Sequence, residues 1–216
     1  MLRPIPILAF LLAGAIPALR ADPLTDRGIA LYNANNVAAA RPLLERAVAA
    51  DPRNAAACYF LGEIIAEPGG ERALEEAEQW LSRAVDLAPG NETYLSDYGG
   101  NSLELAEKKH SLEFALRGRN AMLKAIGMDP GDFDAREGLM RFYAQAPWPL
   151  GSASKAREQA AAIVLRDRAR GLRDLITLGR IHEGAHETGA ARASFAAVLA
   201  IDPRNTAALQ ALDRLR

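Results

Sequence analysis

Apolar residues recur along this chain at spacings of three and four, and a proline follows most of the stretches in which they do so. Spacings of i, i+3, i+4 and i+7 place side chains on one face of an α-helix. A proline lacks the N–H that a helix needs and disfavours helical geometry in the residue before it. The sequence therefore predicts helices that end at Asp51-Pro52, Ala88-Pro89, Asp129-Pro130 and Asp202-Pro203. No strand pattern competes, and we expect an all-α chain.

The same set of positions repeats ahead of these prolines. Each copy has a small residue, an alanine or similar residue further on, a bulky apolar residue and a second small residue before the proline. Small residues lie where two helices approach closely, and a lone helix pair leaves one apolar face exposed. Stacking several pairs buries those faces, so the repeat is the unit of stability. Two copies are Gly28, Ala40, Leu44, Ala47, Pro52 and Gly179, Ala191, Phe195, Val198, Pro203.

In this order the residues resemble the tetratricopeptide repeat family, and the resemblance covers nearly everything after residue 21. The second and third copies are Leu61, Gly62, Ala77, Leu81, Ala84, Pro89 and Leu95, Gly99, Met122, Ala125, Pro130. The resemblance implies a domain over residues 22–216, built as a right-handed solenoid of about five antiparallel helix pairs. Residues 205–216 would form a C-terminal capping helix.

The spacing of the prolines departs from the family's repeat of about 34 residues. The first two lie 37 residues apart, and we expect the extra residues in the turn at Pro68, Gly69 and Gly70. The next spacing is 41 residues, which implies about one extra turn on each helix of the third pair. The last is 73 residues, the length of two repeats, so the fourth copy lacks its proline. We expect Arg168 or Ala169 at its closing position.

Residues 1–21 have the pattern of a secretory signal peptide. Arg3 precedes an apolar run from Ile5 to Leu19, and a small residue, Ala21, offers a cleavage site. The run is shorter than the roughly 20 apolar residues of a transmembrane helix and contains prolines. We expect cleavage after residue 21 and an exported, periplasmic protein without a membrane span. An uncleaved anchor stays open as an alternative, because Leu19 is larger than the cleavage site prefers.

A narrower resemblance agrees with export. The pairs Gly138-Leu139, Phe142-Tyr143, Gly151-Ser152 and Lys155-Ala156, with Gln145-Ala146-Pro147, are similar to a stretch of exported tetratricopeptide proteins of Gram-negative bacteria. This resemblance bears on the cellular compartment of the protein and not on its mechanism.

Composition narrows the partner class. The formal net charge of the chain is −1, which argues against broad nucleic-acid binding. Residues 63–78 are strongly acidic and residues 155–180 are basic, which gives the chain two poles of charge.

The single cysteine, Cys58, cannot form an internal disulfide and occupies an apolar position of its helix, so we expect a buried thiol.

One motif suggests chemistry. His182, Glu183 and His186 have the spacing of a zinc peptidase, in which two histidines one helical turn apart bind the metal. The longer form of the motif needs a third histidine where this chain has Arg192, and the shorter form needs a later glutamate, which is absent after Glu187. A zinc metallopeptidase is therefore an alternative and not the main hypothesis, and we expect no catalytic residues, metal or cofactor.

The resemblance also indicates which residues face a partner, because the first helix of each pair lines the inner face of such a solenoid. The family's carboxylate clamp is not supported, since Thr25 and Ile29 occupy its first positions. We expect a protein or peptide partner, held by a scaffold or adaptor of the cell envelope; a structural subunit of an envelope complex is a further alternative. The partner's identity and the oligomeric state stay open. The expected contact residues are Tyr59, Glu63, Ser96, Glu137, Arg141, Arg173 and Arg180.

Overall fold

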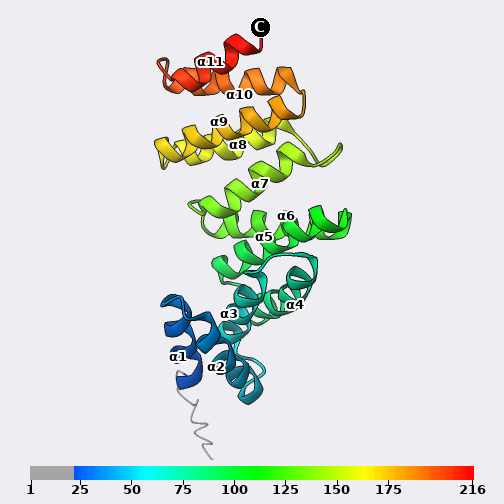
Figure 1. Ribbon diagram of the computed structural model, residues 1–216, viewed down its shortest axis with the longest axis vertical. Helices are drawn as coiled ribbons and strands as arrows, with labels where there is room; N and C mark the ends of the chain where they lie inside the picture. Colours follow the sequence, from blue (N-terminus) through cyan, green and yellow to red (C-terminus); the bar gives the residue numbers. More distant parts are fainter. Residues whose placement is uncertain (1–21) are drawn as a thin grey trace, which may run out of the picture.

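The computed structural model describes residues 22–216, which form helices and no strand. Successive helices pack as antiparallel pairs that stack in chain order from α1 to α11 (Figure 1). Five pairs and a final single helix account for these residues, so the predicted helical solenoid is confirmed. The predicted signal peptide lies outside the described residues. The helices are α1 Pro23–Asn33, α2 Val37–Ala50, α3 Ala55–Ala66, α4 Glu71–Leu87, α5 Glu92–Lys109, α6 Leu112–Met128, α7 Phe133–Gln145, α8 Ala153–Val164, α9 Arg168–Gly184, α10 Thr188–Ile201 and α11 Thr206–Arg214.

Short polar side chains fix where most of these helices begin. An Asp, Asn or Ser precedes the first turn and accepts a hydrogen bond from a backbone N–H that has no partner within the helix. Together with the prolines, these caps define both ends of a repeat. The capping residues are Asp22, Asn36, Asn54, Asn91, Ser111, Asp132, Ser152, Asp167 and Asn205.

Glycine allows the two helices of a pair to approach closely. A methyl group added at Gly62 would lie 2.6 Å from Leu81, and one added at Gly179 would lie 2.6 Å from Phe195, as the repeat pattern predicts. In α5 and α6 the backbones themselves meet, because a methyl group at Gly118 would lie 2.7 Å from the backbone oxygen of Gly99. Buried leucines, alanines and aromatic residues form two core clusters, one within α2 to α4 and one from α5 to α11.

Two expectations about the repeat boundaries are wrong. The turn before α4 has only four residues, 67–70, and the added length of that repeat lies in α4 itself, which has 17 residues against 14 in α2. Arg168 and Ala169 do not close the fourth copy, since α8 ends at Val164 and both residues belong to α9. Asp167 caps α9 through the N–H of Arg170, and this bond places the start of the helix at Arg168.

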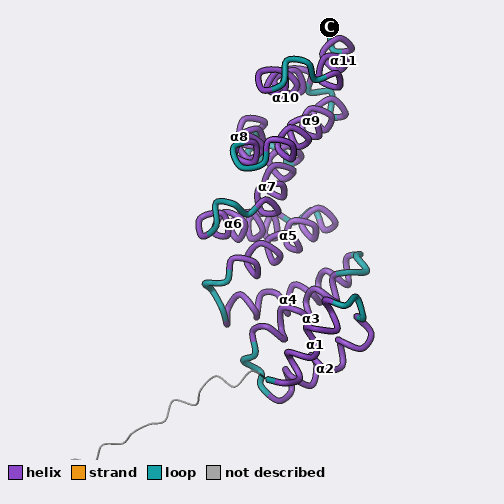
Figure 2. Tube along the Cα trace, turned by 90° about the vertical axis from the view of Figure 1, so that its left-hand side faces the viewer, coloured by secondary structure: helices purple, strands orange, loops and turns teal. Residues whose placement is uncertain are grey.

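The third pair is longer than its neighbours, as predicted. Helix α5 has 18 residues and α6 has 17, whereas α7 has 13. Helix α7 ends at Gln145 because Ala146, the residue before Pro147, is extended. The tip of the α5–α6 hairpin and the loop after α7 therefore lie at the same edge of the stack, on the right in Figure 1. Figure 2 shows the helices joined by loops along the stack. Within residues 22–216, no helix combines the length and apolar character needed to cross a membrane.

Candidate functional site

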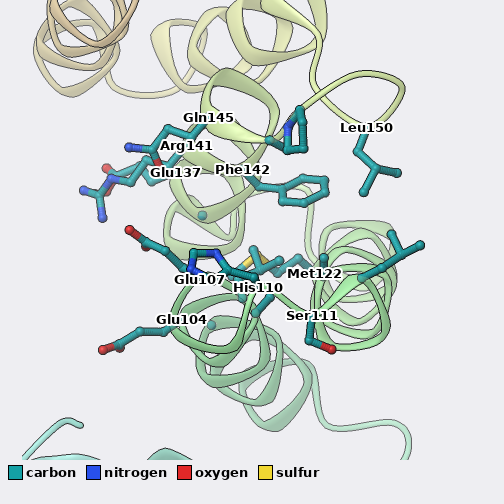
Figure 3. Close-up of a pocket in the computed structure, with 18 of the residues that line it drawn as sticks. Glu104, Glu107, His110, Ser111, Met122, Glu137, Arg141, Phe142, Gln145 and Leu150 are labelled. Carbon is teal, nitrogen blue, oxygen red and sulfur yellow. The ribbon is translucent and has the colours of Figure 1, made fainter. Parts of the chain in front are cut away.

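The mismatch in length between the third and fourth pairs opens a groove. It lies between the α5–α6 hairpin and α7, and its volume is about 880 Å³. Phe142 points from α7 toward Leu150 of the following loop, with Met122 of α6 nearby (Figure 3). Leu103 and Leu112 add apolar surface from the hairpin. Leu112 is 60% exposed, so its side chain is available to a ligand.

Charged side chains gather on the opposite side of this groove. Figure 3 shows Glu104, Glu107, Glu137 and Arg141 there, pointing away from Phe142 and Leu150. Four carboxylates, including that of Asp134, line the groove against the single guanidinium of Arg141. The groove is thus apolar along one wall and acidic along the other.

An arginine of the next repeat holds two of these carboxylates. Arg170 of α9 donates to Glu137 Oε1 at 2.5 Å and to Asp134 Oδ1 at 2.8 Å. Arg141 lies 4.0 Å from Glu137. Because Arg170 reaches from α9 to α7, it fixes the fourth pair against the fifth and orients the acidic wall.

A smaller cavity of about 210 Å³ continues this surface toward α3. Glu63 enters it from α3, while Ser96, Asp97 and Asn101 enter it from α5. The two hollows share part of their lining, namely Gly100, Glu104, Met122 and Asp134. A bound chain that follows one of them would reach the other.

Burial shapes the acid–base behaviour of the smaller cavity. Burial, together with the nearby carboxylate of Asp97, raises the pKa of Glu63 to about 7. Burial also raises the pKa of Asp97, although the hydroxyl of Tyr59 donates a hydrogen bond to its Oδ2 at 2.5 Å and opposes the rise. Both carboxylates are therefore poorly solvated without a compensating cation.

The structure distributes the seven expected contact residues over three places. Glu63 and Ser96 line the smaller cavity, and Glu137 and Arg141 line the groove. Tyr59 is buried and supports Asp97.

The remaining two, Arg173 and Arg180, are exposed on α9 and line neither hollow. Between them on this helix, Asp174 is 9% exposed, and its burial, with Glu137 nearby, raises its pKa to about 6.

Several lining residues were not among the expected contacts. Asp97 and Glu104 are seven residues apart on α5 and share one face of this helix, so the helical period relates them once that face is known to line the hollows. His110 is exposed and lines the groove from a left-handed position at the end of α5. Phe142 and Leu150 line it because α7 stops early, and this depends on the lengths of neighbouring repeats.

The zinc-peptidase motif does not have the geometry that its chemistry needs. Helix α9 ends at Gly184, so His182 and His186 do not lie one turn apart on one helix. His182 is buried, whereas His186 is exposed and has a φ of 60°. Glu183 is 3.3 Å from Arg214 of α11. Among residues 22–216, no group of three or more potential ligands is arranged to hold a metal ion.

The structure also bears on the expected burial of Cys58 and on the acidic segment 63–78. Cys58 is fully buried, as expected, and burial raises the pKa of its thiol. The acidic segment 63–78 is partly neutralised within the fold, since Lys109 pairs with Glu71 and Glu75, and Arg117 pairs with the buried Glu78.

Comparison with known proteins agrees with the architecture. Residues 25–92 match the model of the tetratricopeptide repeat family. The fold is similar to that of YrrB, a tetratricopeptide repeat protein described as having an unusual peptide-binding site, with 19% identity over 89% of this chain and 92% of YrrB and a TM-score of 0.66. No curated protein matches the chain significantly.

Two further solved structures show the same arrangement. A tetratricopeptide repeat protein of Parabacteroides merdae has 18% identity, covers 89% of this chain and 70% of its own, and gives a TM-score of 0.62. MamA has 19% identity, with 82% and 88% of the two chains covered and a TM-score of 0.64. At these identities the likeness concerns the fold, and together with the family match it supports tetratricopeptide-type repeats in this chain.

Proposed function

We propose that this chain, a helical repeat protein of the tetratricopeptide type, is a non-catalytic scaffold that binds an extended segment of another protein. The binding site is the groove between the α5–α6 hairpin and α7. The groove itself carries this proposal, because it has a volume of about 880 Å³ and is lined by one apolar wall and one acidic wall. Such a concave site orients a ligand through few polar groups and gains affinity from apolar burial.

The apolar wall supplies the anchor for the bound segment. Phe142, Leu150 and Leu112 belong to different elements, so a side chain inserted among them would bury apolar surface from three directions. Burying one large apolar side chain contributes about 1.5–3 kcal/mol before the cost of ordering the chain. A leucine, methionine or phenylalanine of the partner fits this position.

The remaining expected contacts extend the site along the inner face. Glu63 and Ser96 lie on the α3 side of the groove and Arg173 and Arg180 on the α9 side, so the partner segment crosses several repeats. Arg173 and Arg180 are seven residues apart on α9 and hence share one face of the helix. Their guanidinium groups suit carboxylates of the partner segment that lie on the α9 side of its apolar anchor.

We also propose that the protein works in the cell envelope. The pattern of residues 1–21 supports this, since a charged start, an apolar run and a small residue at position 21 are typical of a secretory signal peptide. A fusion of residues 1–30 to a reporter that is active only after export tests this point. Retention of the reporter in the cytoplasm contradicts it.

Selection of peptides from a random library displayed on phage tests the groove. We expect the purified protein to enrich peptides that share an apolar anchor. Phe142→Glu and Leu150→Asp should each lower the affinity for a selected peptide at least tenfold.

A matched control uses Leu165, which is 87% exposed on the turn before α9 and does not line the groove. Leu165→Asp should leave the affinity unchanged. A library that yields no peptide, or peptides whose binding ignores Phe142 and Leu150, overturns the proposed function.

A further inference from the structure

The geometry points to a subsite for a basic side chain in the cavity of about 210 Å³ between α3 and α5, with Glu63, Asp97 and Asn101 as its acceptors. This inference rests on the proposed function and specifies the partner: the bound segment carries a lysine or arginine close to its apolar anchor. Three observations support the assignment, namely the placement of the acceptors, the unpartnered oxygen of Asn101 and the lack of a cation beside the two carboxylates.

Helix α5 arranges the acceptors in a row. Asp97, Asn101 and Glu104 are spaced by four and three residues, so their side chains lie along one face of the helix. Glu63 of α3 faces the same cavity. Because the row runs from the cavity into the larger groove, a ligand with a cation and an apolar group a few residues apart meets both hollows.

Asn101 is the most informative residue of the row. It is 7% exposed, and its Nδ2 donates to the backbone oxygen of Leu74 at 3.1 Å and to Oε2 of Glu78 at 2.7 Å. Both of these atoms are acceptors, so the amide cannot rotate by half a turn without losing both bonds. Its Oδ1 is consequently turned away from them, and this buried oxygen has no partner within the protein.

An unpaired buried acceptor costs free energy comparable to a lost hydrogen bond. Asn101 is also one of the residues that line the cavity, and a donor that reached its Oδ1 would remove this cost.

The two carboxylates beside it lack a cation. The ion pairs of this region, within residues 22–216, join arginines to Glu78, Asp134 and Glu137, and none joins Glu63 or Asp97 to a lysine or arginine. The hydroxyl of Tyr59 is a neutral donor to Asp97 and leaves its charge in place. A cation bound between Glu63 and Asp97 would offset the cost of burying both.

Both basic side chains have donors that suit these acceptors. A lysine ammonium has three N–H donors, which match the carboxylates of Glu63 and Asp97 and the amide oxygen of Asn101. An arginine guanidinium offers a planar set of donors to the same atoms. A bound metal ion is not favoured, because no cluster of ligands in the described part of the chain has suitable geometry.

The peptides selected on the groove provide the probe. In the tightest of them, each lysine or arginine is replaced in turn by norleucine, which keeps the length of a lysine side chain and removes its charge. Affinities are measured by fluorescence anisotropy with the purified protein. We expect one basic position at which the replacement weakens binding at least tenfold.

Variants of the protein assign that position to the cavity. Glu63→Gln and Asp97→Asn should each reduce the preference for lysine over norleucine to less than threefold, while the norleucine peptide binds as before. Glu67→Gln is the matched control, because Glu67 is an exposed glutamate four residues further on that does not line the cavity. It should retain the full preference.

Four results would overturn the subsite. If selected peptides bind through the apolar wall and contain no basic residue, or if lysine and norleucine peptides bind equally to the unaltered protein, the groove stands and the basic subsite falls. Loss of the preference in Glu67→Gln as well would show general attraction to an acidic surface. A library without any binder removes the proposed function together with this inference.

Discussion

The Nδ1 atom of His182 lies 2.6 Å from Oε2 of Glu187, across the turn that ends α9. His182 is 1% exposed, whereas the carboxylate of Glu187 is half-exposed on the other side of the turn. The pair therefore links the buried face of α9 to the start of α10. A histidine that the sequence offered as a zinc ligand has a structural role instead.

Substitution of the two histidines should have unequal effects on stability. His182→Ala removes a buried ring and its hydrogen bond, and should lower the free energy of unfolding by about 2–4 kcal/mol. His186→Ala, at an exposed position, should change it by less than about 0.5 kcal/mol. Urea unfolding followed by circular dichroism measures both. Equal losses, or stoichiometric zinc that disappears in both variants, would contradict the structural role.

Two glycines of α6 should respond oppositely to the same change. Gly118 lies against the backbone of α5, so Gly118→Ala should destabilise the protein by about 1–3 kcal/mol. Gly127 has open space around it, and Gly127→Ala should stabilise by about 0.5–1 kcal/mol because alanine favours the helix. Thermal unfolding of the two variants decides the point. A similar shift of both melting temperatures would mean that α5 and α6 are not in such close contact.

Removing the charge of Glu63 should make the protein more stable at high pH. The pKa of Glu63 rises from 4.5 to about 7 in the folded state, so the folded protein binds the proton more tightly than the unfolded chain. The contribution of this residue to the free energy of unfolding therefore falls as the pH rises from about 4.5 to about 7. After burial, the carboxylate of Asp97 on α5 is the cause of this rise, and Glu63 in turn contributes to the raised pKa values of Tyr59 and Tyr32.

The measurement compares Glu63→Gln with the unaltered protein between pH 5 and pH 8. The stability advantage of the variant should grow over this range and reach about 1–2 kcal/mol at pH 8. Its loss of lysine preference should accompany this gain, which separates a binding residue from one that only supports the fold. A variant that is less stable at pH 8 would show that Glu63 has a stabilising partner.

Reversal of the charge on the exposed face of α9 should affect only part of the ligand. In a variant with both Arg173→Glu and Arg180→Glu, peptides with an Asp or Glu on the α9 side of the anchor should bind about fivefold more weakly, since each exposed ion pair contributes little. Arg192→Glu, an exposed change on α10, is the control. Equal weakening of peptides with and without acidic residues would contradict a direct contact.

The repeat pattern predicted the pairs of helices because it records contacts that every copy must make. Gly28 against Leu44 and Gly179 against Phe195 are contacts between residues that are 16 positions apart in both copies, so the shared spacing identifies them. Polar residues of the inner face were partly predictable for the same reason, as Glu63, Ser96 and Glu137 show.

The groove was not predictable in this way, because it arises from a difference between copies. The early end of α7 before Pro147 and the extra turns of α5 and α6 are each visible in the sequence. Their combination brings Phe142 and Leu150 into the same hollow as His110, which no single repeat contains. The boundary error at Arg168 has a related cause, since the local cap at Asp167 sets the start of α9 and the repeat sets only the average spacing of the helices.

A hollow formed by unequal neighbours can be edited through the lengths of their helices. Trimming one turn from both helices of the α5–α6 hairpin would bring its tip level with the end of α7, and most of the hollow would vanish while each pair kept its packing. Lengthening the hairpin would deepen it. Repeat arrays of this kind can therefore gain or lose a recognition surface through insertions and deletions, a route that leaves every core contact intact.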